Sequence, residues 1–317
     1  PQFSVEHMSM VWRKLGRVFS PSRLPAGMVS HAAVPIAEML DSYVLRIYFS
    51  ARDRRSQSHV LFADVDIRRP GEILRLSPGP VLSPGRLGCF DDSGAIGSCL
   101  IRKGGRTYIY YVGWNLGCTV PFRNAIGLAV WDEKKAVFRR CYEGPIMDRT
   151  KEEPHFVASC HVLREQETYK MWYLSCVDWQ IKDGRPFHRY HIKYARSGDG
   201  IDWQRDATVA LDFRDAYEYA ISVPRVINDG DRYRMWFSSR ASRTAETYRI
   251  GYAESPDGIR FSRQAAEAGI DVSASGWDSE MICYPYVFDL DGRRYMLYNG
   301  NAYGKTGFGL AVLKQER

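Results

Sequence analysis

The sequence has no long hydrophobic run and no cysteine pair of the metal-binding kind. No apolar stretch approaches the roughly 20 residues that a membrane-spanning helix needs, so we expect no transmembrane span. Residues 1–7 lack the basic and apolar regions of a signal peptide. The seven cysteines are odd in number and form no C-x-x-C pair, which disfavours a disulfide framework and a zinc site. We therefore expect a cytoplasmic protein, in a reducing compartment, with neither a metal nor a cofactor.

The sequence also lacks the common enzyme fingerprints and any dense run of one charge. It contains no G-x-S-x-G elbow, P-loop, dinucleotide-binding glycine motif or H-E-x-x-H pair. The net charge is +7, but the basic residues are scattered. A solvated basic surface is the simplest interpretation, and an anionic ligand such as a phosphate, a uronic acid or a nucleotide sugar is the alternative. Without a helix–turn–helix, zinc-finger or RNA-binding signature, nucleic acid is not an expected partner.

What the sequence has instead is a five-fold repeat of short β-type segments. Each repeat begins with an apolar segment that contains a proline or cysteine near its middle, and these anchors are Pro35, Cys99, Cys160, Pro224 and Pro285. The anchors are 64, 61, 64 and 61 residues apart. After each anchor come a turn and two further segments rich in aromatic and β-branched residues, which favour strands. A β-type motif of about 60 residues that occurs five times indicates a five-bladed β-propeller.

The fourth segment of a repeat is an aromatic residue followed by basic residues, and the last repeat lacks it. Its counterpart stands at the other end of the sequence, at 10–14. We predict an all-β fold, a five-bladed β-propeller with four-stranded antiparallel blades, in which an N-terminal strand closes the last blade. One domain would span 1–317, and its blades would lie near 28–80, 90–142, 153–206, 217–264 and 277–313 plus 8–15.

Acidic residues recur just before the predicted inner strands, which would line the central funnel. Seven residues before the anchor stand Asp92, Glu153 and Asp278. We expect these three carboxylates to converge around the axis, where like charges raise one another's pKa. The alternative is that each only caps a turn, as 91–94 would do if read alone. Further candidates near this position are Asp91, His155, Glu218 and Glu280.

Antiparallel pairing returns the end of each second strand to the same mouth. The polar and aromatic residues expected there are Arg52, Trp114, Trp179, Arg240 and Asn301, together with His31 at the start of the first inner strand. Tryptophan faces stack on sugar rings, and arginine and asparagine hydrogen-bond to hydroxyl or acidic groups. The alternatives are packing between blades for the tryptophans and a structural role for His31.

These features resemble the five-bladed glycosidase superfamily, which includes arabinanases, xylosidases, invertases, levansucrases and mannoside phosphorylases. The sequence is also similar to propeller proteins found with bacterial surface-polysaccharide genes, through 113–114, 248–253 and 298–301. The superfamily resemblance implies that Asp92 is the second-blade acid that tunes the reaction and that Glu153 is the third-blade general acid. Met28 stands where the first-blade base would be, so the base would be Asp278 or Glu280.

We therefore predict a carbohydrate-active, glycoside-hydrolase-like enzyme that cleaves or transfers a glycosidic bond by carboxylate acid/base catalysis. Its ligand would be a saccharide, a glycoside or a sugar nucleotide. Two alternatives remain. A phosphorylase or sugar-nucleotide-acting enzyme would hold phosphate with His31, Arg52 and Arg240. A sugar-binding propeller would use the same mouth without catalysis, since a fold does not determine a function.

Overall fold

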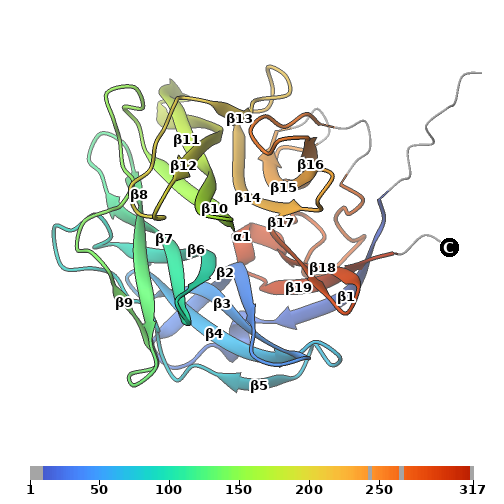
Figure 1. Ribbon diagram of the computed structural model, residues 1–317. Coiled ribbons are helices and arrows are strands. Elements are labelled where there is room, and N and C mark those ends of the chain that lie inside the picture. Colours follow the sequence, from blue (N-terminus) through green and yellow to red (C-terminus); the bar gives the residue numbers. More distant parts are fainter. Residues whose placement is uncertain (1–9, 242–244, 264–267, 315–317) are drawn as a thin grey trace, which may run out of the picture.

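The protein is almost entirely β-structure, as predicted. The computed structural model describes residues 10–241, 245–263 and 268–314 (Figure 1). These residues form strands β1 to β19, a short 3-10 helix η1 (Pro21–Arg23) and a four-residue helix α1 (Asn301–Gly304). No helix in the described part of the sequence has the length and hydropathy to cross a membrane.

Antiparallel pairing joins consecutive strands into groups that surround a common centre (Figure 1), which is the arrangement of a β-propeller. We call these groups blades I to V. Blade I contains β2 (Met28–Met39), β3 (Val44–Asp53), β4 (Ser58–Asp66) and β5 (Ile73–Leu76). Blade II contains β6 (Gly94–Lys103), β7 (Arg106–Leu116), β8 (Phe122–Asp132) and β9 (Val137–Arg140).

Blades III and V repeat this order of four strands from the inner strand outward. In blade IV the described residues form three strands and an isolated bridge between Glu254 and Ser262, which corrects the prediction of four strands in every blade. Blade III contains β10 (Val157–Glu165), β11 (Thr168–Lys182), β12 (Arg185–Ser197) and β13 (Val209–Leu211). Blade IV contains β14 (Ala220–Asn228), β15 (Tyr233–Arg240) and β16 (Arg249–Ser255). Blade V contains β17 (Cys283–Leu290), β18 (Arg293–Asn299), β19 (Phe308–Leu313) and β1 (Trp12–Phe19).

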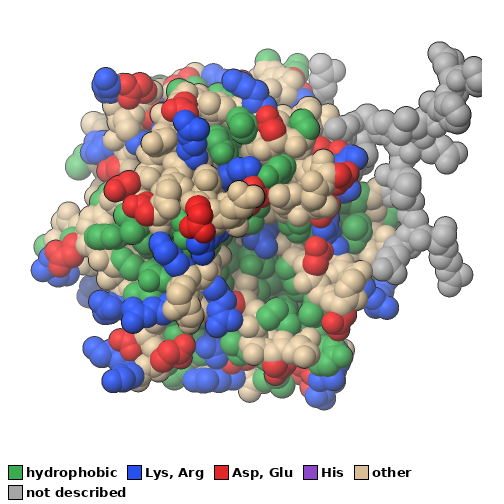
Figure 2. All heavy atoms as spheres, in the orientation of Figure 1, with side chains coloured by type: hydrophobic (Ala, Val, Ile, Leu, Met, Phe, Trp, Pro, Cys, Tyr) green, Lys and Arg blue, Asp and Glu red, His purple; other side chains and the backbone are tan. Residues whose placement is uncertain are grey.

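The core lies between the blades and is built mainly from the second strands. Their large side chains are fully buried, which explains why these segments of the sequence are rich in aromatic residues. Among these side chains are Tyr48, Tyr110, Trp172 and Trp236. Ring contacts join neighbouring blades, as where Trp12 of β1 packs edge-on against Trp236 of β15 with ring centroids 6.2 Å apart. On the surface, acidic and basic side chains are interspersed over the face drawn in Figure 2.

The proline and cysteine anchors mark a β-bulge in each inner strand. The pairing register shifts by one residue at the anchor in all five blades. In three blades the residue before the proline has a positive φ: Val34 at 54°, Val223 at 47° and Tyr284 at 57°. This conformation is costly for a bulky or β-branched residue. It turns the backbone amide of the bulge toward the preceding blade.

Each of these amides donates a hydrogen bond to a side-chain oxygen of that preceding blade. The acceptors are Asn299 Oδ1 at 2.8 Å, Ser159 Oγ at 3.0 Å and Ser238 Oγ at 2.7 Å. The amide of Cys160 donates in the same way to Ser98 Oγ at 2.7 Å. Buried amides must find acceptors, so these bonds fix where each inner strand lies relative to its neighbour.

Blade V closes the ring in two ways. Strand β1 pairs antiparallel with β19, so the N-terminal segment supplies the outer strand of the last blade, as predicted. The buried side-chain amide of Asn299 also donates to the carbonyls of Ala32 at 2.7 Å and Gly307 at 2.9 Å. The last blade is therefore bonded to both the N-terminal strand and the first inner strand.

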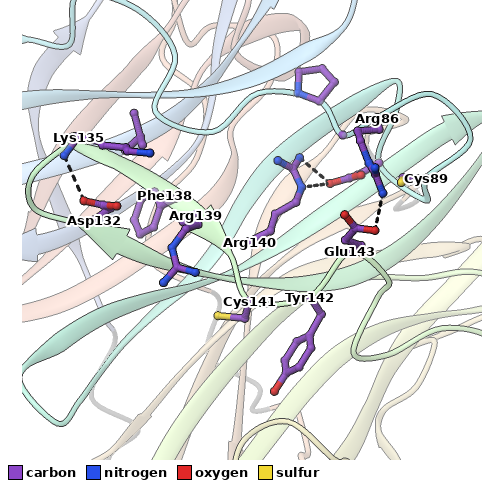
Figure 3. A pocket seen from close by; sticks show the side chains of 14 residues that line it. Arg86, Cys89, Asp132, Lys135, Phe138, Arg139, Arg140, Cys141, Tyr142 and Glu143 are labelled. Carbon is purple, nitrogen blue, oxygen red and sulfur yellow. Dashed lines mark hydrogen bonds and ion pairs between the residues drawn. The ribbon is translucent and has the colours of Figure 1, made fainter.

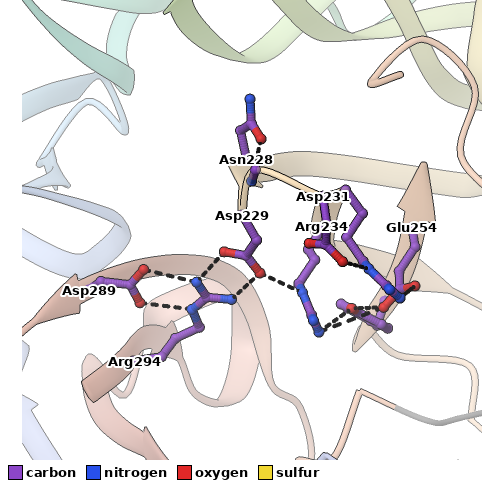
Figure 4. A network of polar contacts seen from close by, with 10 residues as sticks. Asn228, Asp229, Asp231, Arg234, Glu254, Asp289 and Arg294 are labelled. Atoms are coloured by element: carbon purple, nitrogen blue, oxygen red, sulfur yellow. Dashed lines mark hydrogen bonds and ion pairs between the residues drawn. The ribbon is translucent and has the colours of Figure 1, made fainter. Parts of the chain in front are cut away.

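An ion-pair network joins blades IV and V at the turns that follow their inner strands (Figure 4). Asp229 lies 2.6 Å from Arg294 and 2.6 Å from Arg234, and Arg294 also binds Asp289 at 2.8 Å. Burial alone would raise the pKa of Asp229, but hydrogen bonds and charge from Arg294 and Arg234 lower it below the ordinary value. The network therefore links the two blades in a charge-dependent way.

The role of β1 can be tested by truncating its buried tryptophan. We expect Trp12→Ala to lower the free energy of unfolding by about 3–5 kcal/mol, because a large buried ring is lost. Val11→Ala is the matched control: Val11 precedes the same strand and is 40% exposed. Urea denaturation measures both. Equal stabilities of the two variants would show that β1 does not close the blade.

The interblade ion pairs predict a pH-dependent stability. Asp229→Asn should lose about 1–3 kcal/mol near neutral pH, the range for hydrogen bonds to charged groups. The folded-state pKa is depressed, so this stability is present above the unfolded pKa, about 3.9, and is lost as pH falls through the folded value. The difference in unfolding free energy between the variant and wild type should therefore be smaller at pH 3 than at pH 7, as measured by denaturation at both pH values. Asp231→Asn, in the exposed part of the same turn, should remain close to wild type, and a gap that persists unchanged at low pH would rule out a charge effect.

Candidate functional site at the funnel mouth

Glu153, the predicted general acid, is buried at the entrance to β10 and faces its own blade. It is 4% exposed. Its Oε1 accepts a hydrogen bond from the Tyr173 hydroxyl at 2.8 Å, and its Oε2 accepts one from Ser175 at 2.9 Å. Lys193 and Arg205 lie 3.8 and 3.9 Å from Oε2. Both carboxylate oxygens of Glu153 therefore have partners within blade III.

Asp278 repeats this arrangement in blade V. It is 2% exposed, and its Oδ2 accepts hydrogen bonds from the Tyr298 hydroxyl at 3.0 Å and from Lys14 Nζ at 2.7 Å. Lys14 belongs to β1, the outermost strand of the blade. The carboxylate therefore connects the entrance of the inner strand to the outer strand.

In blade II the equivalent residue is Asp91 and not Asp92, which corrects the prediction. Asp91 is fully buried and accepts hydrogen bonds from Tyr111 at 3.0 Å and from Arg140 of β9 at 2.8 Å. Asp91, Glu153 and Asp278 each stand 20 residues before their tyrosine. Asp92 instead accepts the amide of Gly88 at 3.0 Å and the hydroxyl of Ser93 at 3.0 Å, so it caps a turn.

Glu218 completes the set in blade IV. It is 2% exposed, pairs with Arg263 at 2.6 Å and accepts a hydrogen bond from Ser239. We call Asp91, Glu153, Glu218 and Asp278 the clamp carboxylates. Each is directed toward a cation from the outer part of its own blade, which differs from the expected convergence on the axis. Buried carboxylates need such partners because desolvation is costly.

A cavity of about 480 Å³ adjoins the Asp91 clamp (Figure 3). The segment before β6 and the outer strand β9 line it, and it contains the Asp91–Arg140 pair and an exposed pair between Arg86 and Glu143. The cavity lies at the outer strand of blade II. These charged groups are therefore already paired with one another.

A different set of side chains gathers around Arg240, at the end of β15. The guanidinium of Arg240 lies 5.1, 5.4 and 5.6 Å from the ring centroids of Tyr248, Tyr303 and Tyr219. Its Nη2 donates a hydrogen bond to the Tyr303 hydroxyl at 2.6 Å. Its Nε is buried and has no acceptor among the described residues, and no described carboxylate lies within 4.0 Å. Arg240 is thus a half-buried cation, with a buried Nε, surrounded by aromatic rings.

Blades III, IV and V all contribute to this group, which we call the tyrosine cluster: Tyr190, Tyr219, Tyr248, Tyr284 and Tyr303. The hydroxyls of Tyr190 and Tyr248 hydrogen-bond to each other, and Ser222 donates to the second at 3.2 Å. Burial raises the pKa of Tyr190 to about 12. The cluster offers ring faces and neutral hydroxyls beside one positive charge.

The long β11–β12 hairpin extends this cluster with Trp179 and His188. Their ring centroids are 4.7 Å apart, and His188 stacks on Tyr190 at 5.2 Å. Burial, together with the charge of Arg240, lowers the pKa of His188 to about 4. Trp179, a predicted ligand-binding residue, therefore lies next to the tyrosine cluster. Phe156 packs against Trp179 at 5.7 Å, and the half-buried His155 precedes it.

The blade I side of the mouth is also cationic. His31 is 7% exposed, and its Nδ1 lies 2.9 Å from Ser30 Oγ. Burial, Arg52 and Lys305 together lower its pKa to about 4. Lys305 follows α1, which lies at the centre of the ring (Figure 1) and carries Tyr303 to Arg240. Arg52 and Lys305 therefore supply positive charge at the mouth, whereas His31, the other predicted residue, is neutral near pH 7.

The remaining predicted residues have local structural contacts. Trp114 donates to Ser58 of blade I at 3.3 Å and covers Gly94, so it packs between blades. Asn301 accepts the amides of Glu280 and Met281 at 2.8 and 3.0 Å. The Glu280 side chain is exposed. Among the described residues, no group of three His, Cys, Asp or Glu side chains could hold a metal ion.

Sequence reasoning identified Arg240 but missed the tyrosines around it and His188. The available signal lay in the third strands: Tyr190 is the sixth residue of β12, and Tyr248 directly precedes β16. Tyr190 lies at the mouth because it pairs with Ala220, the first residue of the inner strand β14.

No family model matches the sequence. The protein is 41% identical over 305 residues to the Mycobacterium tuberculosis protein named Uncharacterized protein Rv1502, and the match covers 96% of this protein and all of that one. A solved structure described as a glycoside hydrolase has a TM-score of 0.75 at 18% identity, over 98% of this protein and 94% of that one. A thermostable family-43 glycoside hydrolase has a TM-score of 0.65 at 16% identity, over 93% of this protein and 91% of that one.

A structure described as a glycosyl hydrolase from Bacteroides ovatus has a TM-score of 0.70 at 13% identity, over 96% of this protein and 94% of that one. At these identities the likeness concerns the fold. The protein therefore has the β-propeller fold of these glycoside hydrolases and belongs to the same family as the mycobacterial protein Rv1502.

Proposed function

We propose that this protein is a carbohydrate-active, glycoside-hydrolase-like enzyme that binds a saccharide at the funnel mouth, over the tyrosine cluster. The observation that supports this most is the grouping of Tyr219, Tyr248 and Tyr303 around Arg240, in a fold shared with glycoside hydrolases. Aromatic faces suit the apolar faces of sugar rings, and a few convergent polar groups suit their hydroxyls.

Glu280 is the best candidate for the acid or base among the predicted acids. A catalytic carboxylate must come within hydrogen-bond reach of the reacting group. The clamp carboxylates are at most 4% exposed and are bonded to groups of their own blades, whereas Glu280 is exposed. Its backbone carbonyl accepts the Thr247 hydroxyl at 3.0 Å, beside Tyr248 of the cluster. We therefore assign the clamp carboxylates to holding the blades and Glu280 to proton transfer.

A sugar-binding propeller without catalysis is the second candidate. The burial and pairing of the four clamp carboxylates favour this candidate, because Glu153 and Asp278, two of the acids predicted from the sequence, are among them. Both candidates place the saccharide at the same mouth. Measured turnover of a saccharide distinguishes the enzyme from the sugar-binding propeller.

Saccharide binding at the cluster is tested with Tyr219→Ala. Tyr219 is partly exposed beside Arg240, so we expect the variant to bind saccharides about tenfold more weakly, a loss of about 1.4 kcal/mol. A panel of saccharides and aryl glycosides, followed by saturation-transfer NMR and product release, gives both binding and turnover. Tyr142→Ala, which removes an exposed tyrosine from the region of the blade II cavity, is the control. Equal weakening by both variants would place the ligand elsewhere.

The assignment of the acids is tested by two isosteric substitutions. We expect Glu280→Gln to reduce turnover at least ~100-fold with an unchanged melting temperature, because proton transfer is lost. Glu153→Gln should instead cost about 1–3 kcal/mol of stability, because buried charge-assisted hydrogen bonds are weakened. Initial rates and thermal denaturation of both variants decide this. Loss of turnover in a fully stable Glu153→Gln protein would restore Glu153 as the general acid, and binding without any turnover in wild type would favour the second candidate.

A further inference from the structure

We infer that Arg240 receives an anionic group, a carboxylate or a phosphate, carried by the saccharide. This inference rests on the proposed function and specifies its substrate class. It begins from the contrast between Arg240 and other partly buried arginines of the protein. Arg46, Arg140, Arg263 and Arg294 each contact a carboxylate at 2.6–2.9 Å. Arg240 has tyrosines in place of a carboxylate.

A partly desolvated cation without a counter-charge is costly unless something else compensates. The ring faces around Arg240 supply part of that compensation through cation–π attraction. They do not supply an acceptor to Nε, which is buried and unpaired among the described residues. An anion with two oxygens could accept hydrogen bonds from one edge of the guanidinium, which is the geometry that arginine favours.

Arg225 is another arginine without a carboxylate partner, but its guanidinium is bonded to other groups of the protein. Its Nε donates to the carbonyl of Val287 at 2.7 Å, its guanidinium stacks on Tyr286 at 4.2 Å, and its Nη1 contacts His161. Its polar groups are thus shared among protein partners. Arg205 Nη1 and Arg234 Nε are also buried without a hydrogen bond, but each lies within 4.0 Å of a carboxylate, and Arg240 has no such carboxylate among the described residues.

The surroundings of Arg240 add further positive charge to the mouth. Arg52 and Lys305 lower the pKa of His31, and Arg240 lowers that of His188, each in addition to the effect of burial. The exposed Glu280 offsets this only in part, because it is solvated. A mouth of this kind attracts anions and concentrates them.

The contact between Arg240 and Tyr303 also suggests how the ligand enters. Tyr303 and Ala302 both have positive φ, at 60° and 52°, so the segment holds an unfavourable backbone conformation. The Tyr303 hydroxyl takes the Nη2 hydrogen bond at 2.6 Å. An anion on the saccharide would replace that hydroxyl with a charged acceptor and would also satisfy Nε.

The test compares charged and neutral probes of similar shape. Wild-type protein is titrated with D-glucuronate, glucose 1-phosphate, inorganic phosphate and D-glucose, and binding is followed by NMR. We expect glucuronate or glucose 1-phosphate to bind at least tenfold more tightly than glucose. Arg240→Gln should weaken the anionic sugar about 10–100-fold, the range for a charge-assisted hydrogen bond, and should weaken glucose less, so that the preference for the anionic sugar is lost. Arg214→Gln removes the same charge from an exposed arginine paired with Asp215 and should keep the preference.

The pKa of His188 reports where the anion binds. Arg240→Gln, or the bound anion in wild type, should raise it above about 4, because the repulsion by Arg240 is removed or neutralised, while burial, the larger cause, still keeps it below the ordinary value. Equal affinity for glucose and glucuronate, unaltered by Arg240→Gln, overturns the inference and leaves the proposed function standing. Binding of phosphate that depends on Arg240, without binding of any saccharide, supports the anion site and overturns the proposed function. A His188 pKa that no anion changes overturns the site itself.

Discussion

The bulge in each inner strand is the constraint on which the rest of the structure depends. It leaves a backbone amide that cannot pair within its own blade, and a side chain of the preceding blade accepts it in four of the five blades. Asn299 does this at the closing interface and binds two further carbonyls. A buried amide without a hydrogen bond would lower the stability of the folded state. These bonds therefore hold the blades at fixed relative positions where the inner strands approach the axis.

The charged side chains divide into two groups once this ring is in place. Most partly buried cations are paired with carboxylates, as in the four clamps and the Asp229 network, and these pairs join strands or blades. At the mouth, by contrast, Arg240, Lys305 and Arg52 lie near histidines and tyrosines. The first group holds the fold together, whereas the second group produces a positive electrostatic potential at the funnel mouth, which acts on an entering ligand.

The sequence was sufficient to predict the strands and the closure by β1, because spacing and aromatic content repeat along it. It was not sufficient to predict side-chain direction at the strand entrances. In blade II one extra residue separates the clamp carboxylate from the anchor, so counting back from the anchor selected Asp92 when Asp91 is the equivalent of Glu153. The tyrosines around Arg240 come from three blades, and no spacing within one repeat reveals that they meet.

The pairing of β1 with β19 has a consequence for synthesis of the protein. Trp12 pairs with Leu313, so β1 must wait until β19 has been synthesised. At the usual rate of translation that delay is roughly 15–60 s for some 300 residues. During this time Trp12, Val18 and Phe19, all buried in the finished blade, lie on an unpaired strand that can join other polypeptides. Production of the protein should therefore depend on how well β1 is shielded until β19 has been synthesised.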